Sequence, residues 1–236
     1  METPFTIESI SKSLTGLAIM KLINENIIEL DDPVQKHLPW FTLEDKQAAA
    51  QMTIKQLLTQ TSGISTYTGL LLSDKEAEDF GVIKNNVKSL SNVKLASPLG
   101  EKHQYSNANF LILGALIEEV TKQTYAEYME KNVFLPLGMR NAAANHDLAY
   151  QKGYLKGYQS WFGIPRKSAV SYDNGGAPYG YITASAKDMI QYLQFLSQHS
   201  FNNFLNEENR NLYNTTYSNR EKSILWFRPT NFKSRL

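Results

Sequence analysis

PFTIESISKSLTGLAIMKL, residues 4–22, lies close to the start of the chain, and Lys12 and Lys21 are its only charges after Glu8. Between residues 10 and 23, apolar side chains fall on nearly all sides of a helical wheel. A helix of this kind is predicted to be buried. Burying a lysine in an apolar helix is unfavourable, so the presence of Lys12 in the first turn indicates a role other than packing.

Ser9 precedes Lys12 by three residues, so both side chains are predicted on one helix face, about 5–6 Å apart. Burial disfavours a charged amine, and the pKa of Lys12 is therefore expected to be lowered. A neutral amine could accept the Ser9 proton, and the helix dipole would favour negative charge beside that serine. The alternative is a lysine that extends to solvent and has no chemical role. The same S-x-x-K spacing recurs at Ser91 and Lys94, in a polar stretch that offers no comparable setting.

Tyr105 and Asn107 form a second candidate pattern, Y-x-N, in a turn-rich segment directly before the apolar run FLILGALI. A tyrosine near a lysine could carry a proton, and an asparagine amide could hold a substrate amide. The pattern alone is weak, because it recurs at 172–174 and 217–219 and turns commonly contain such residues. The position of the first copy at the base of a strongly apolar helix distinguishes it from the other two.

The composition argues against several classes of function. The 236 residues include 24 Lys and Arg against 23 Asp and Glu, which gives a net charge of +1, and there is no cysteine. This balance predicts no nucleic-acid partner, and disulfides and thiolate sites are excluded. The four histidines show neither HExxH nor i, i+4 pairing, so no metal and no cofactor is expected. METPFT lacks the features of a signal peptide, and no apolar run approaches the ~20 residues that span a bilayer.

Hydrophobic periodicity predicts a mostly helical chain with few strands. The predicted helices cover 10–23, 52–65 (closed by Gly63), 110–123, 125–134 and 185–198 (with Ser185 as N-cap). Residues 66–95 are predicted as a long loop with one or two helices, and 140–180 as loops with short strand pieces. The Asn-rich residues 201–236 are expected to pack poorly.

Four blocks, in this order, resemble the β-lactamase-related serine hydrolases, which include class C β-lactamases, D-alanyl-D-alanine carboxypeptidases and related esterases. FTIESISKSLTGLAIMKLINENIIELDDPVQKHLP (5–39) resembles the segment that carries the nucleophile. MTIKQLLTQTSGI (52–64) is similar to the family's LLTHTSG stretch, with Gln60 where histidine is usual. PLGEKHQYSNANFLILGALIEEVTKQTYAEYMEKNVFLPLGM (98–139) resembles the tyrosine-motif block, and GYITASAKDMIQYL (180–193) a later helix.

The resemblance implies an α+β fold of the β-lactamase/transpeptidase type and a serine hydrolase that needs no cofactor. Ser9 would be acylated, with its N–H as one half of the oxyanion hole, and Lys12 would accept its proton. Tyr105 would protonate the leaving group and later activate water, and Asn107 would bind the substrate's amide. The implied substrates are peptidoglycan stem peptides of the D-Ala-D-Ala type, β-lactams or small esters. Full-length relatives usually work outside the cytoplasmic membrane.

Two features of that family are not found in the sequence. No Lys, His or Arg is followed by x-Gly, the family's third motif, and only eight residues precede Ser9, where the family has strands. We therefore expect mostly the helical part of the fold, with most of the antiparallel sheet missing. The expected organisation is an incomplete domain at 1–200 and a poorly packed tail at 201–236.

Three functions stay open: an active serine hydrolase, an inactive remnant or binding module of the family, and a helical structural domain. The compartment does not follow from this chain.

Overall fold

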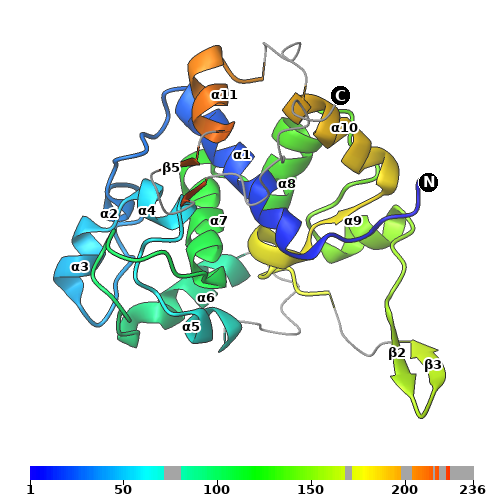
Figure 1. Ribbon diagram of the computed structural model, residues 1–236, viewed down its shortest axis with the longest axis horizontal. Helices are drawn as coiled ribbons and strands as arrows, with labels where there is room; N and C mark the ends of the chain where they lie inside the picture. Colours follow the sequence, from blue (N-terminus) through cyan, green and yellow to red (C-terminus); the bar gives the residue numbers. More distant parts are fainter. Residues whose placement is uncertain (72–80, 168–171, 198–203, 215, 218–221, 224–236) are drawn as a thin grey trace, which may run out of the picture.

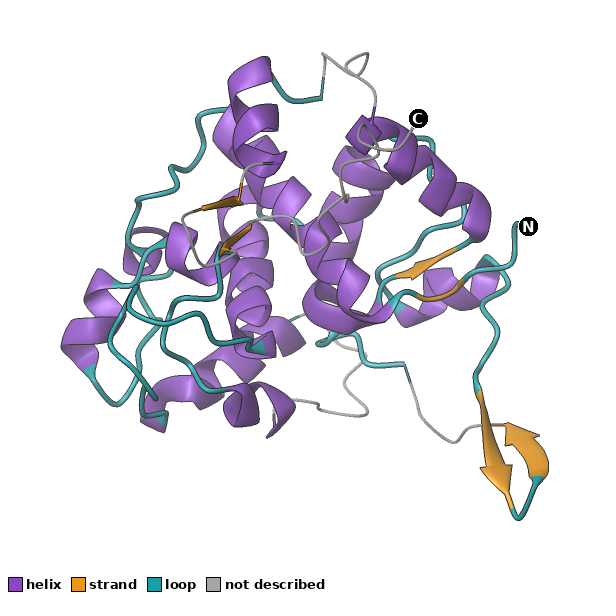
Figure 2. Cartoon of the chain, in the orientation of Figure 1, coloured by secondary structure: helices purple, strands orange, loops and turns teal. Residues whose placement is uncertain are grey.

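The computed structural model describes residues 1–71, 81–167, 172–197, 204–214, 216–217 and 222–223 (Figure 1). Helices predominate in these residues, and the strands are short (Figure 2). In chain order the first elements are β1 (Phe5–Thr6), η1 (3₁₀, Glu8–Ile10), α1 (Ser11–Asn24), α2 (Val34–His37), α3 (Lys46–Gln51), α4 (Ile54–Leu58), α5 (Thr66–Leu71), α6 (Val82–Lys88), η2 (3₁₀, Ser89–Asn92) and α7 (Asn107–Thr121). They are followed by α8 (Tyr125–Met129), η3 (π-helix, Glu130–Phe134), α9 (His146–Gln151), β2 (Tyr158–Trp161), β3 (Ile164–Lys167), η4 (π-helix, Ala177–Tyr181), β4 (Thr183–Ala184), α10 (Ala186–Ser197), α11 (Glu207–Asn214), β5 (Thr216–Tyr217) and β6 (Lys222–Ser223).

The helix predicted over residues 10–23 is α1, and η1 continues it toward the N-terminus. Every residue from Ser11 to Met20 is buried, as the apolar pattern predicted. α7, α11 and η4 pack against this helix, which runs through the middle of the molecule (Figure 1). A helix that is apolar on nearly all sides therefore has neighbours on nearly all sides.

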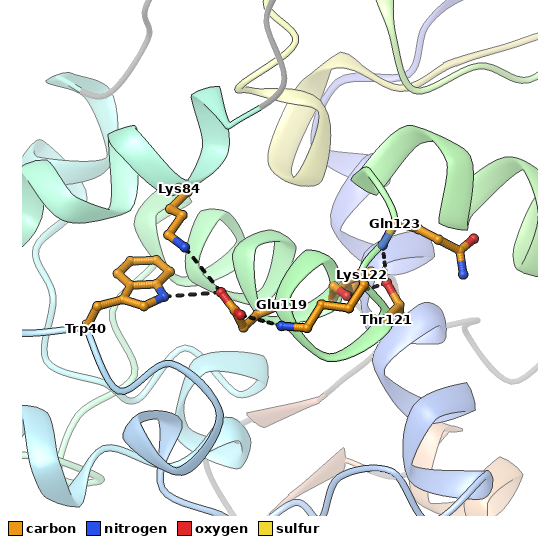
Figure 3. Close-up of polar contacts among 7 residues, drawn as sticks. Trp40, Lys84, Glu119, Thr121, Lys122 and Gln123 are labelled. Carbon is orange, nitrogen blue, oxygen red and sulfur yellow. Dashed lines mark hydrogen bonds and ion pairs between the residues drawn. The ribbon is translucent and has the colours of Figure 1, made fainter.

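α7 is the second central helix, and the loop that carries Tyr105 leads into it. Its residues 108–117 are all buried. At the far end of the helix, Glu119 accepts a hydrogen bond from Trp40 Nε1 at 3.3 Å (Figure 3). The same carboxylate pairs with Lys84 at 3.4 Å and Lys122 at 2.5 Å. These contacts link the C-terminal end of α7 to α6 and to the segment after α2.

Strand pairing in the described residues consists of three two-stranded antiparallel pairs and two isolated antiparallel bridges, Pro33–Thr53 and Ala143–Thr183. In the pair β1–β4, Phe5 lies opposite Ala184. The Ile7 N–H donates to the Ile182 carbonyl at 2.9 Å, which continues this pairing up to the start of η1. The pair β2–β3 is an exposed hairpin that projects from the body of the molecule (Figure 1). The prediction of a mostly helical chain with little sheet is confirmed for the described residues.

The helix predicted over 52–65 is shorter than expected. α4 ends at Leu58, and Gln60, with φ of 58°, turns the chain through the left-handed region. Gly63 does not close the helix, but its φ of 79° and its surroundings still require glycine. A Cβ at this position would lie 2.1 Å from the Ser97 carbonyl oxygen.

Part of the expected C-terminal tail is well packed. Leu205 and Tyr213 are buried, and the Tyr213 hydroxyl donates to the Ser13 carbonyl at 2.8 Å and lies 2.7 Å from the Tyr192 hydroxyl. The expectation of poor packing from residue 201 is therefore wrong for residues 204–214, because a few apolar side chains of this Asn-rich segment dock on α1 and α10. Residues 201–203, 215, 218–221 and 224–236 lie outside the described residues.

Candidate functional site

Three of the predicted side chains meet at the Ser9 hydroxyl. Ser9 lies in η1 and Lys12 in the first turn of α1, whereas Tyr105 comes from the loop before α7. Lys12 Nζ donates to Ser9 Oγ at 3.2 Å. The Tyr105 hydroxyl lies 2.8 Å from the same Ser9 oxygen. Packing of α7 against α1 brings these two distant parts of the sequence together.

Lys12 is 0% exposed, which excludes the alternative of a lysine that extends to solvent. Its Nζ donates to the Tyr179 carbonyl at 2.5 Å and lies 4.9 Å from the centre of the Tyr105 ring. Burial lowers the pKa of Lys12 to about 7, and the Glu8 carboxylate acts weakly in the opposite direction. The direction of the pKa change predicted from the apolar helix is confirmed. Near neutral pH a substantial fraction of the amine is therefore uncharged.

The Tyr105 phenol is half-buried, and burial raises its pKa although the hydrogen bond with Ser9 acts to lower it. A raised pKa means that the phenol keeps its proton at neutral pH. Of the two groups beside the Ser9 oxygen, Lys12 is therefore the available base and Tyr105 an available acid. The Thr66 hydroxyl donates to the Tyr105 carbonyl at 2.5 Å and helps to fix this loop.

Asn107 is the first residue of α7, two positions beyond Tyr105. Its Oδ1 is buried and, in the part of the chain that the structure describes, has no hydrogen-bond partner. A buried acceptor without a donor is unfavourable, so an N–H group of a bound molecule would satisfy it. α5 supports this residue closely, because a Cβ on Gly69 would lie 2.6 Å from the Asn107 backbone nitrogen.

Gln60 holds the loop that carries Tyr105. Its Oε1 accepts from the Ser106 N–H at 3.0 Å and from Asn109 Nδ2 at 2.5 Å. Its backbone carbonyl accepts from the Gln104 N–H at 2.8 Å, so Gln60 bonds to residues on both sides of Tyr105. Gln60 occupies the position where the family's LLTHTSG stretch usually has histidine. This difference from the family is the feature of the sequence that could have drawn attention to residue 60.

The other copies of the two patterns have different surroundings. Lys94 is 78% exposed and pairs with Glu44 at 3.4 Å, as expected of a surface lysine. Tyr172, in the second Y-x-N copy, is buried and packs edge-on against neighbouring tyrosine rings. The third copy, 217–219, falls partly outside the described residues.

Besides Gln60, two more residues at the site were not among the sequence candidates. The Tyr179 carbonyl binds Lys12, but a backbone acceptor leaves no residue signature in the sequence. Glu8 has a φ of 46°, which composition and spacing do not reveal. In the described ranges no group of three acidic or histidine side chains could hold a metal ion. Across the same ranges, no helix combines the length and the apolar character needed to cross a membrane.

This arrangement of helices and short strands is that of the β-lactamase/transpeptidase fold. The penicillin-binding protein from Bacillus halodurans matches it with a TM-score of 0.76 at 25% identity, over 92% of this chain and 66% of that chain. The β-lactamase family model matches residues 1–226, and the chain belongs to this family. The predicted family and fold class are thus confirmed.

Two curated relatives from Staphylococcus aureus are similar in sequence. Protein flp (strain MW2) is 33% identical over 198 residues, which are 82% of this chain and 38% of that protein. Teichoic acid D-alanine hydrolase (strain MRSA252) is 30% identical over 156 residues, 66% of this chain and 36% of the relative. The chain therefore spans well under half the length of each of these relatives.

Proposed function

We propose that this chain provides the nucleophile site of a serine hydrolase, in which Ser9 is acylated by D-Ala-D-Ala-like peptides, β-lactams or esters. The observation that carries the proposal is the geometry at Ser9 Oγ, with the Lys12 nitrogen at 3.2 Å and the Tyr105 oxygen at 2.8 Å. A hydroxyl held between a base and an acid is what nucleophilic catalysis needs. The lowered pKa of Lys12 and the raised pKa of Tyr105 suit these two roles.

In the acylation step Ser9 Oγ attacks the carbonyl carbon of the substrate, and its proton passes to neutral Lys12. Negative charge develops on the carbonyl oxygen, where the Ser9 N–H and the start of the helix favour it. Tyr105 then gives its proton to the leaving group and regains one from the Lys12 ammonium. The bond to the leaving group breaks as the Ser9 ester is completed, and no net charge is gained.

In the deacylation step water takes the place of the leaving group and follows the same path in reverse. The oxygen of Tyr105 accepts the water proton as its own phenolic proton moves toward Lys12. The Ser9 ester breaks, the free acid leaves, and Ser9 recovers its proton. Asn107 would orient the substrate, because its unpartnered Oδ1 can accept an N–H of the acyl group.

The choice of substrates is supported by the relatives. One is named as a teichoic acid D-alanine hydrolase, which indicates D-alanyl esters, and a solved neighbour is a penicillin-binding protein. All of these substrates present a carbonyl group, next to a D-configured centre in the D-alanyl compounds, that can be transferred to a serine.

The second candidate is a binding module of the same family that is acylated slowly or not at all. It is favoured by the lack of any Lys- or His-x-Gly in the sequence, the motif that supplies the second oxyanion N–H in the family. One N–H donor of an oxyanion hole typically increases kcat by a factor of about 10²–10³. Detectable turnover that depends on Ser9 would argue against this candidate.

The pH dependence of hydrolysis tests the proposed hydrolase directly. N-acetyl-D-alanine p-nitrophenyl ester is a suitable probe because its charge does not change with pH. Because the pKa of Lys12 is about 7, its neutral fraction and hence kcat/KM should rise about tenfold between about pH 6 and about pH 8. The rate of the Ser9→Ala variant is subtracted as background. A profile that stays flat to about pH 9, or that rises only near the ordinary lysine pKa, would contradict the role of Lys12.

A further inference from the structure

Glu8, the residue directly before Ser9, has an unusual backbone conformation. Its φ of 46° lies in the left-handed region, where glycine would be favoured over a residue with a side chain. The Glu8 side chain is exposed. Within the described ranges, none of the ion pairs involves its carboxylate. Backbone strain of this kind is found most often at functional sites. A carboxylate outside any ion pair, at a strained position next to Ser9, is therefore a candidate for a functional role.

The surroundings of Glu8 are rich in tyrosine. η1 packs against η4, the segment that contains Tyr181. The carboxylate adds to the raised pKa values of Tyr105, Tyr154 and Tyr181, in each case as a smaller cause than burial. Residue 8 adjoins Ser9, whose oxygen lies 2.8 Å from the Tyr105 hydroxyl, so this contact and the packing of η1 on η4 place two half-buried phenols, Tyr105 and Tyr181, near residue 8. Carboxylates attract cations, and tyrosine ring faces do the same.

We propose that Glu8 selects substrates whose acyl group carries a positive charge close to the scissile carbonyl, such as aminoacyl esters with a free ammonium group. This inference rests on the proposed function, because a carbonyl carbon bound at Ser9 Oγ brings its own α-substituent next to residue 8. The tyrosines beside Glu8 would accommodate the same cation. An acyl group with a carboxylate at that position would be repelled.

A pair of isosteric esters isolates this effect. In betaine p-nitrophenyl ester the acyl group ends in a trimethylammonium, and in 3,3-dimethylbutanoic acid p-nitrophenyl ester a tert-butyl group has the same shape without charge. We expect Glu8→Gln to lower the ratio of kcat/KM for the cationic over the neutral ester about five- to tenfold relative to wild type. Intrinsic reactivity of the two esters cancels in this comparison. The wild-type ratio should also fall at about 1 M salt, which screens exposed charges.

Glu208→Gln is the matched control, because Glu208 is an exposed carboxylate on α11 and its loss changes the net charge equally. This variant should keep the wild-type ratio, and Glu8→Lys should move the ratio further than Glu8→Gln. An unchanged ratio in folded Glu8→Gln, with Ser9-dependent release still present, would overturn the role of Glu8 alone. No Ser9-dependent release from either ester would overturn the proposed hydrolase, and this inference with it.

Discussion

Replacement of Lys12 by methionine is expected to lower the rate of Ser9 acylation by about 10²–10⁴-fold, the usual contribution of a positioned general base. Methionine has a similar length and fills the same buried space, so the loss should reflect proton transfer and not collapse of the site. The measurement is kcat/KM for N-acetyl-D-alanine p-nitrophenyl ester at about pH 8, where Lys12 is mostly neutral.

The same substitution should make the protein more stable. Lysine has a pKa of 10.5 when unperturbed, and burial lowers that of Lys12 to about 7. The unfolded chain therefore holds this proton more tightly than the folded protein, and the free-energy cost is present in full below about pH 7 and disappears toward pH 10.5. After allowing for the lost hydrogen bond to Tyr179, Lys12→Met should raise the free energy of unfolding by about 1–3 kcal/mol at pH 7. The gain should shrink as the pH approaches 10.

Lys94→Met is the control for both measurements, since Lys94 has the same S-x-x-K spacing but is 78% exposed. It should leave acylation unchanged and alter the free energy of unfolding by less than about 0.5 kcal/mol. If Lys12→Met retained acylation within about threefold of wild type, Lys12 would not be the base. If it unfolded more easily than wild type at neutral pH, the buried amine would not be the destabilising group inferred from its pKa.

Tyr105→Phe is expected to have an effect that depends on the leaving group. The ring is kept while the hydroxyl at 2.8 Å from Ser9 Oγ is lost. An amide leaving group needs a proton in the transition state, so N-acetyl-D-alanine p-nitroanilide should lose about 10³-fold in kcat/KM. p-Nitrophenolate leaves without protonation, and the corresponding ester should lose about tenfold.

The control for this series is Tyr67→Phe, because Tyr67 is on α5 and 68% exposed. It should leave both rates unchanged. Equal losses for the ester and the anilide in Tyr105→Phe would mean that Tyr105 positions Ser9 but does not protonate the leaving group.

Much of the fold could be predicted because its central elements depend on local pattern. The mostly apolar residues 10–23 and the apolar run at the start of 110–123 predicted two helices, and α1 and α7 lie in the core of the structure. Ser185 was predicted as the N-cap of the helix that follows, and its Oγ accepts from the Asp188 N–H at 3.2 Å. Such features need only a few neighbouring residues to determine them.

The remaining features depend on contacts between distant parts of the chain. The Asn-rich composition near the C-terminus gave no sign of α11. This helix is anchored by hydrogen bonds from the Tyr213 hydroxyl to Ser13 and Tyr192, which are far away in the sequence. α9 is a short helix within 140–180, where no helical period was visible. Gln60 forms its hydrogen bonds to the Tyr105 loop from a backbone in the left-handed region. A glutamine in the sequence gives no reason to expect that conformation.

At the site, spacing and composition singled out Ser9, Lys12, Tyr105 and Asn107, but each pattern occurs more than once in the sequence. The position of the first copies next to strongly apolar helices separated them from the others, the family resemblance supplied their expected roles, and the structure brings the first three of these side chains together. The roles of all four residues are proposals that rest on chemistry at the Ser9 hydroxyl. Glu8 could not have been identified from the sequence, because the features that make it a candidate are its backbone φ and its spatial neighbours.

The central claim is that Ser9 is the acylated nucleophile, and intact-protein mass spectrometry tests it most directly. The chain is incubated with N-acetyl-D-alanine p-nitrophenyl ester or a penicillin and quenched in acid, and the adduct is located by peptide mapping. We predict one acyl group per chain, on Ser9, that is absent in Ser9→Ala and unchanged in Ser91→Ala, which alters the serine of the other S-x-x-K copy. Folded, soluble protein that forms no adduct, or an adduct that persists in Ser9→Ala, would contradict the claim.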